Sequence, residues 1–517
     1  MDINGGWILP AIYALGSLWA FPLKGSHWQV ARLTSVVALL ATVAVALAAL
    51  IRAFGAEPLH ADPVGLVTAV LVAGLGWVIV QYSARYLEGE PGQDGFVRAM
   101  LFTLTAVGFL VVSDHLLVLA LAWTGTSLGL HHLLTFYPQR QAAQVVAHKK
   151  ALTSRLAELC LAVALILVYV VTGTLSLDGL EIWLANKENL PASLHIAAVF
   201  FALAAIIKTA QLPLHGWLIQ VMEAPTPVSA LLHAGIVNMG GFVLIRLGDL
   251  ISLAPAAQAL LVGVGTATAV LAGLVMLTRI SVKVRLAWST CAQMGFMIME
   301  IGLGLYELAL LHLIAHSAYK AYYFLSAGET VYSVRQRTLV QAAPGGKTLL
   351  RYLAAFGVSA LLVLASLLAW QEFLPLLEIP FIALFILALG LSSLMWSEQG
   401  LMPRQLLWSL VSVLGLVQLY LVWHLLFDEL VADFAGASSL SVAWVLAWFS
   451  AFYLCQAWLR LYPEGQFSRR FYPWAYAGFY LDETFTRLTF RLWPIKYSPA
   501  QSQTLVNGYK TAEGELL

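Results

Sequence analysis

Long apolar runs recur from one end of the 517-residue sequence to the other, and this feature constrains the fold most. Each run is about 20 residues long, the length at which an α-helix crosses the hydrocarbon core of a bilayer. The alternating polar and apolar pattern of membrane β-strands is absent, so the spans should be helices. We therefore predict an all-α, polytopic membrane protein with about 14 transmembrane helices, in a range of about 13 to 16.

The runs are separated by short, polar connections, none of which is long enough for a soluble domain. The runs cover residues 7–22, 33–54, 64–83, 99–113, 115–136, 156–173, 194–222, 226–247, 256–279, 285–304, 307–331, 349–369, 374–396, 405–427 and 440–460. A less regular run at 471–494 is expected to be an amphipathic or membrane segment, followed by a polar tail. Basic residues fall in connections that this count assigns to both sides, so the positive-inside rule does not fix the orientation.

The composition agrees with a membrane protein. Hydrophobic residues make up 60% of the chain and charged residues 11%, whereas about 25% of the residues in a soluble globular chain are charged. The formal net charge of +1 argues against a nucleic-acid-binding role. Cys160, Cys291 and Cys455 lie in separate apolar runs, which predicts neither a disulfide framework nor a CxxC metal site.

One lysine lies deep inside an apolar run. Lys208 follows eight apolar residues, FFALAAII, and Pro213 removes a helix hydrogen-bond donor soon after it. Pro225 and Pro227 mark a second interruption. A charged side chain at this depth costs at least ~3 kcal/mol, so it needs a partner or water. Two interpretations stay open: a lysine that exchanges protons with a movable counter-ion, or a structural lysine in a permanent salt bridge.

A second set of ionisable residues is spaced as one helix face requires. His312, His316 and Lys320 are four residues apart at each step, so an α-helix places all three on one stripe. Each step is about 6 Å along the axis, a gap that one water can bridge. Histidine exchanges protons readily near neutral pH, so the stripe predicts a proton ladder. His233 lies between Lys208 and this ladder in the sequence and is a candidate bridge.

Two other interpretations of the stripe remain. Histidines at i and i+4 also suit a metal site, but the glutamate of HExxH and a third ligand are missing. Lys320 argues against a metal as well, because an ammonium group beside a divalent cation would be repelled. Alternatively, each histidine only forms a hydrogen bond to a neighbouring helix. We favour the proton ladder and expect no metal ligands in this chain.

Seven stretches carry a family resemblance. They are ADPVGL (61–66), QYSARYL (81–87), DHLLVLALAWTG (114–125), SRLAE (154–158), residues 208–246, VKVRLAWSTCAQMGFM (282–297) and HLIAHSAYKAYYFL (312–325). With these stretches in the family's order, the chain resembles the antiporter-like membrane subunits, which include the NuoL subunit of respiratory complex I and the MrpA subunit of cation/proton antiporters. The resemblance implies that Lys208 is the central lysine of a broken helix, that His233 follows it, and that His312, His316 and Lys320 form the ladder leading to the middle of the membrane.

The chain departs from the family at the partner of this lysine. Where the family has Trp-Glu-Gly, this sequence has Trp123-Thr124-Gly125, and a threonine carries no charge. Three carboxylates are candidate counter-ions in its place: Glu158, Glu223 and Asp114. Glu158 also follows Arg155 by three residues and could form only a local ion pair.

The second half of the chain is shorter and more divergent than in NuoL. This feature and the phrase QVMEAPTPVSALLHAG (220–235) resemble DabB-type membrane subunits of DAB inorganic-carbon accumulation systems. The resemblance implies a proton-conducting, non-enzymatic subunit of the bacterial inner membrane without a cofactor of its own. It also implies a DabA-type zinc protein, resembling a β-carbonic anhydrase, as the partner in which proton flow drives CO2 hydration to bicarbonate. The alternative is a NuoL/MrpA-type subunit of a complex I-like or cation/proton antiporter complex.

Four segments follow from these observations. We expect N-terminal transmembrane helices at 1–60, an antiporter-like proton-conducting core at 61–335, divergent C-terminal transmembrane helices at 336–470, and the amphipathic or membrane segment with its tail at 471–517.

Overall fold

The computed structural model shows a bundle of helices. It describes residues 5–20, 26–54, 62–185, 189–328, 348–375, 377–396, 403–428, 430–431 and 436–493. Within these residues there are helices and one isolated β-bridge, between His115 and Ser176, but no strand. The all-α prediction is confirmed. The expected segment boundaries after residues 60 and 335, and the polar tail from residue 494, lie outside the described residues.

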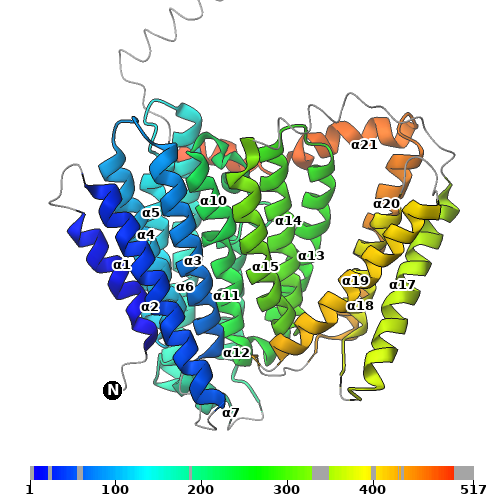
Figure 1. The fold of residues 1–517 in the computed structure, drawn as a ribbon, viewed down its shortest axis with the longest axis horizontal. Coiled ribbons are helices and arrows are strands. Elements are labelled where there is room, and N and C mark those ends of the chain that lie inside the picture. The colour runs from blue at the N-terminus through cyan, green and yellow to red at the C-terminus, as the bar shows by residue number, and fades with distance from the viewer. Residues whose placement is uncertain are drawn as a thin grey trace, which may run out of the picture.

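The N-terminal helices form one side of the bundle (Figure 1). They are α1 (Ile8–Trp19), α2 (His27–Phe54), α3 (Pro63–Tyr86), α4 (Gln93–Val112), α5 (Leu116–Leu134), α6 (Gln141–Thr172) and the short α7 (Leu177–Ala185). α4 packs against α1 and α5, and α2 packs along α3. The predicted runs 115–136 and 156–173 leave residues 137–155 between them, and the sequence of 138–150, PQRQAAQVVAHKK, reads as a polar connection. α6 begins inside this stretch, so the first turns of the helix extend beyond the apolar run.

The central helices include two interrupted spans. They are α8 (Ala192–Lys208), α9 (Gly216–Ile219), the 3-10 turn η2 (Gln220–Glu223), α10 (Thr226–Ala234), η3 (Ile236–Asn238), α11 (Met239–Arg246), α12 (Gly248–Ser252), α13 (Pro255–Leu277), α14 (Val282–Gly302) and α15 (Tyr306–Leu325). The interruption after Lys208 is confirmed. The chain is also non-helical at residues 224–225, directly before α10, and a further interruption that the sequence did not predict lies at residues 235–238, in the middle of the span Thr226–Arg246.

Glycines hold α13 and α14 unusually close together. A Cβ on Gly295 would lie 2.6 Å from the amide nitrogen of Ala269, and one on Gly265 would lie 2.6 Å from the carbonyl oxygen of Gly295. In a bilayer, helices associate through such small-residue contacts because lipid provides no hydrophobic force to drive them together. On its other side α14 packs against α15, with which it shares the polar residues described below.

The C-terminal helices stand beside this core (Figure 1). They are α17 (Leu349–Gln371), α18 (Phe381–Ser392), α19 (Pro403–Asp428), α20 (Ser439–Leu461), α21 (Gln466–Tyr476) and α22 (Glu483–Leu492). α19 contacts α15 and α20 contacts α13, and a second hydrophobic cluster lies between the two groups. α21 lies across the upper ends of the helices in Figure 1, so the run at 471–494 does not form one continuous span.

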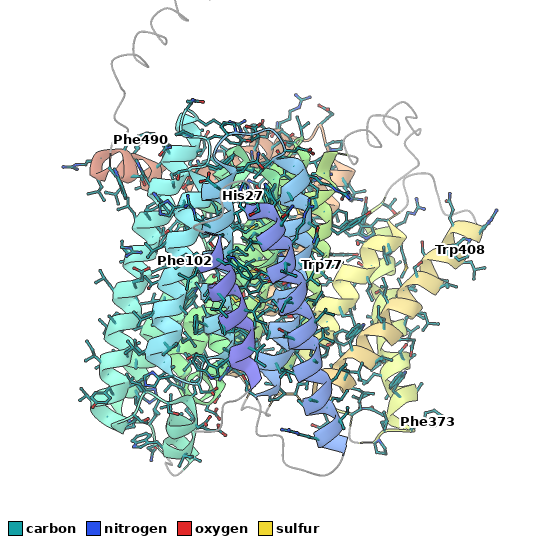
Figure 2. The ribbon with its side chains drawn as sticks, turned by 60° about the vertical axis from the view of Figure 1, so that its left-hand side comes forward. His27, Trp77, Phe102, Phe373, Trp408 and Phe490 are labelled. Carbon is teal, nitrogen blue, oxygen red and sulfur yellow. The ribbon has the colours of Figure 1, made fainter. Side chains whose placement is uncertain are left out.

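The helices suit a bilayer in number and in surface. Ten described helices are long and apolar enough to cross one, and three shorter apolar helices accompany them. α14 and α15 carry more charged residues but run alongside them (Figure 1), so the number of crossings lies within the predicted range of about 13 to 16. Large apolar side chains such as Trp77, Phe102 and Trp408 are exposed on the outside of the bundle, where lipid would cover them (Figure 2).

Candidate proton pathway

Lys208 ends α8 at the point where the backbone leaves the helix. Ala210 adopts a left-handed conformation with φ 57°, and the chain becomes helical again only at Gly216. Neighbouring helices satisfy the backbone groups that this break leaves unpaired. The amide of Leu212 donates to Thr268 Oγ1 at 3.2 Å, and Cys291 Sγ donates to the carbonyl oxygen of Ala210 at 3.4 Å. Non-helical backbone at membrane depth is stable only with such partners.

The Lys208 ammonium group is buried among neutral partners and one carboxylate. It donates to the carbonyl oxygen of Trp123 at 3.0 Å and to Ser127 Oγ at 3.2 Å, and it lies 5.0 Å from the centroid of the Trp123 ring. The nearest carboxylate oxygen, Glu158 Oε1, is 3.9 Å away. Of the three candidate counter-ions, Glu158 on α6 is therefore the one that the structure brings to this lysine.

Glu158 belongs to a stripe on α6 that the sequence analysis missed. Lys150, Ser154 and Glu158 are four residues apart at each step, the same spacing as in the histidine stripe. Lys150 is buried, donates to Ser154 Oγ at 2.8 Å, and lies 4.6 Å from the centroid of the Trp217 ring. The spacing could have revealed this stripe, but the assignment of residues 138–150 to a polar connection hid it.

The other two candidate counter-ions lie elsewhere or are not described. Asp114 accepts a hydrogen bond from Arg246 at 3.0 Å, and Asp62 forms an ion pair with the same guanidinium at 2.5 Å. This cluster joins the lower ends of α3, α5 and α11 (Figure 1). Asp114 therefore forms its ion pair with Arg246 and not with Lys208. Glu223 is part of η2, but its side chain lies outside what the structure describes.

His233 lies on α10, facing α15. Its ring is fully buried and stacks on Phe324 with 4.4 Å between the ring centroids. Neither ring nitrogen has a hydrogen-bond partner in the described part of the chain, so His233 forms no direct bond to Lys208. The interruption that follows it is held by Asn238, whose side-chain amide donates to the carbonyl oxygen of Ala234 at 3.0 Å and to Ser317 Oγ at 2.7 Å.

The predicted stripe on α15 is present as one row. The rings of His312 and His316 have centroids 6.2 Å apart, and both His316 and Lys320 are fully buried. Lys320 donates to the carbonyl oxygen of Leu286 at 3.0 Å and to Ser289 Oγ, both on α14. The row runs along α15, from Lys320 nearer the upper face to His312 nearer the lower face (Figure 1).

Glu300, at the lower end of this row, is a second residue that the sequence analysis did not single out. Glu300 on α14 lies next to His312, with 2.8 Å between Glu300 Oε2 and His312 Nδ1. No motif pointed to it, because it is an isolated glutamate twelve residues before His312 in the sequence. Among the described residues, no group of three His, Cys, Asp or Glu side chains is placed to hold a metal ion.

Comparisons with known proteins identify the family to which this core is similar. The family described as NADH:quinone oxidoreductase/Mrp antiporter, transmembrane region, matches residues 113–345, which contain the broken helix and both stripes. The Mrp complex of Dietzia contains a chain with the same fold, with a TM-score of 0.53, 22% identity, and coverage of 99% of this chain and 59% of that chain.

Two relatives share most of their length with this chain. The probable inorganic carbon transporter subunit DabB of Hydrogenovibrio crunogenus is 38% identical over 96% of this chain and 96% of that protein. The probable inorganic carbon transporter subunit DabB2 of Halothiobacillus neapolitanus is 37% identical over 85% of this chain and 81% of that protein. The chain therefore belongs to the DabB family of inorganic carbon transporter subunits, multi-pass membrane proteins with an antiporter-like core.

Proposed function

We propose that this chain conducts protons through the bacterial inner membrane as the membrane subunit of an inorganic-carbon accumulation complex. Proton flow through it drives CO2 hydration to bicarbonate in a DabA-type partner, a zinc protein resembling a β-carbonic anhydrase. The observation that carries the proposal is the buried Lys208 on a broken helix, with Glu158 at 3.9 Å. An ionisable residue inside a membrane span marks an ion or proton pathway by default.

The contacts of Lys208 suit a group that gains and loses a proton. Its two short hydrogen bonds go to neutral oxygens, those of Trp123 and Ser127, while the carboxylate of Glu158 is at a longer distance. Glu158 also pairs with Arg155 at 3.0 Å. A carboxylate with two cationic neighbours can favour one or the other, and each position changes how strongly Lys208 holds its proton.

The rest of the proposed path consists of buried polar groups with few protein partners. The ring nitrogens of His233 and His316 have no hydrogen-bond partner among the described residues. A buried polar group is costly unless it is hydrogen-bonded, so water is their natural partner. Water molecules between His233, His316 and Lys320 would carry the proton from the broken helix to the ladder. In this proposal catalysis and zinc belong to the partner alone.

A second candidate is a NuoL/MrpA-type subunit of a complex I-like or cation/proton antiporter complex. The family match over residues 113–345 supports it, because that core is common to both classes. The identity of the partners separates the two candidates. A short tag on this chain, gentle detergent extraction and affinity purification should recover one large zinc-containing protein. Recovery of many subunits with flavin and iron–sulfur clusters, or of small membrane subunits without metal, would favour the second candidate.

The proton path is tested by its two buried lysines. Lys208→Ala and Lys320→Ala should each abolish growth at low CO2 and lower proton flux in liposomes containing the purified complex by about tenfold or more. Arg487→Ala, which removes an exposed cation paired with Glu483, is the control and should leave both readouts unchanged. Normal flux in both lysine variants, with the same amount of partner bound, would refute proton conduction through this chain.

A further inference from the structure

Glu300 is a buried carboxylate at the lower end of α14. Only 7% of its surface is exposed, and the one described hydrogen-bond partner of its carboxylate is His312 Nδ1, at 2.8 Å. It stands two residues before the helix ends at Gly302, whereas Lys320 stands at the other end of the stripe on α15. The pair therefore extends the row of ionisable groups from α15 towards the lower face.

A cavity lies directly beside this pair. It has a volume of about 350 Å³, is partly open to the outside of the bundle, and is lined by residues of α14, α15, α18 and α19. Each water occupies about 30 Å³ in the liquid, so this volume corresponds to roughly ten waters. Most of the lining is apolar, but Glu300, His312, Gln293 and Tyr420 contribute polar groups. The hydroxyl of Tyr420 and Nε2 of His312 are both buried without a hydrogen-bond partner among the described residues.

The hydrogen bond sets the roles of the two imidazole nitrogens. An ionised carboxylate only accepts hydrogen bonds, so Nδ1 of His312 carries the hydrogen that Glu300 receives. Nε2 of the neutral ring then has a free lone pair. A proton that arrives from the side of His316 binds Nε2, and the carboxylate stabilises the imidazolium ion that results.

The same pair can pass the proton on. The imidazolium gives its Nδ1 proton to Glu300, which leaves a neutral ring with hydrogen on Nε2 and a protonated carboxyl group. The carboxyl group then releases its proton to water in the cavity and becomes a carboxylate again. A turn of the ring returns the hydrogen to the side of Glu300. One proton has then arrived from the side of His316 and one has left from Glu300, and the same steps in reverse carry a proton from the cavity to His316.

We propose that Glu300 and this cavity form the opening of the proton path at the lower face. This inference rests on the proposed function, because it assigns the end of the same path. It also gives the divergent C-terminal helices a role, since α18 and α19 supply one wall of the cavity. Other carboxylates near this face fit less well: Glu372 and Glu378 are exposed, and neither lines the cavity.

The test measures proton flux in liposomes that contain the purified complex. Glu300→Gln keeps the size of the side chain but cannot take up a proton, so flux should fall by about tenfold or more. Glu300→Asp should retain part of the flux. Glu378→Gln, which changes the same charge at an exposed position near the same face, is the control and should conduct normally. Unchanged amounts of bound partner show that each variant is folded.

The lysine variants distinguish failure of this inference from failure of the proposed function. If Lys320→Ala stops conduction while Glu300→Gln conducts normally, the chain conducts protons but Glu300 is not part of the opening at the lower face. If neither change lowers flux, proton conduction itself is refuted.

A second measurement tests the cavity without relying on Glu300. With Cys160, Cys291 and Cys455 replaced by serine, Leu387→Cys in the cavity wall should react with a charged, water-soluble thiol reagent, and the reaction should lower flux. Glu378→Cys is the exposed reference. A Leu387→Cys that stays unmodified while Glu378→Cys reacts would show that the cavity is closed to water, which would overturn the proposal.

Discussion

At the scale of single residues, the carboxylate next to Lys208 lies on α6, whereas the glutamate of the family's Trp-Glu-Gly motif corresponds to Thr124 on α5. Thr124 donates a hydrogen bond within α5, to Ala120, and the carboxylate is Glu158 on α6, 3.9 Å from Lys208.

We expect Glu158→Gln to lower proton flux by about tenfold or more. Adding Thr124→Glu should restore much of it, because residue 124 follows Trp123, whose carbonyl accepts a hydrogen bond from Lys208. Arg487→Gln, which changes an exposed cation away from this pair, is the control. Full flux in Glu158→Gln would exclude this carboxylate as the counter-ion.

At the scale of elements, one ion pair fastens the C-terminal segment to the core. The buried Lys149 of α6 donates to Asp482, just before α22, at 2.7 Å, and to Gln220 and Thr486.

Removing one partner of a buried ion pair leaves an uncompensated charge, so Asp482→Ala should lower the free energy of unfolding by about 3 kcal/mol. We expect a lower thermal midpoint of the protein in detergent and faster proteolysis of α21 and α22. Glu483→Ala, which removes an exposed neighbour paired only with Arg487, should change neither. An unchanged midpoint in Asp482→Ala would show that the segment is held by its apolar contacts alone.

At the scale of the whole molecule, most of the basic residues gather at one face of the bundle. Figure 1 places α21 at the upper face and α7 and α12 at the lower face, which assigns each helix end to a side. Basic residues gather at the upper ends: Arg85, Lys149, Lys150, Arg279, Lys283, Arg285, Arg460, Arg469 and Arg470. The lower ends carry mostly carboxylates: Asp62, Asp114, Asp178, Glu181 and Asp249. The positive-inside rule, which the sequence left undecided, then predicts a cytoplasmic upper face.

This orientation can be measured on whole bacterial cells. In a chain without its native cysteines, Glu181→Cys at the exposed lower face should react with an impermeant maleimide in intact cells. Glu464→Cys, at an exposed position beside α21, should react only after the cells are permeabilised. The reverse pattern would place the upper face outside.

What the sequence determined by itself are the features that depend on local geometry. The length of the apolar runs dictated membrane-spanning helices, and the four-residue spacing placed His312, His316 and Lys320 on one face, because helix geometry requires both. The tertiary structure decided which groups from distant helices meet. That Glu158 and not Asp114 reaches Lys208, that Glu300 ends the histidine row, and that the basic ends share one face all depend on how α5, α6, α8, α14 and α15 pack. Such contacts join residues far apart in the sequence, where no periodicity connects them.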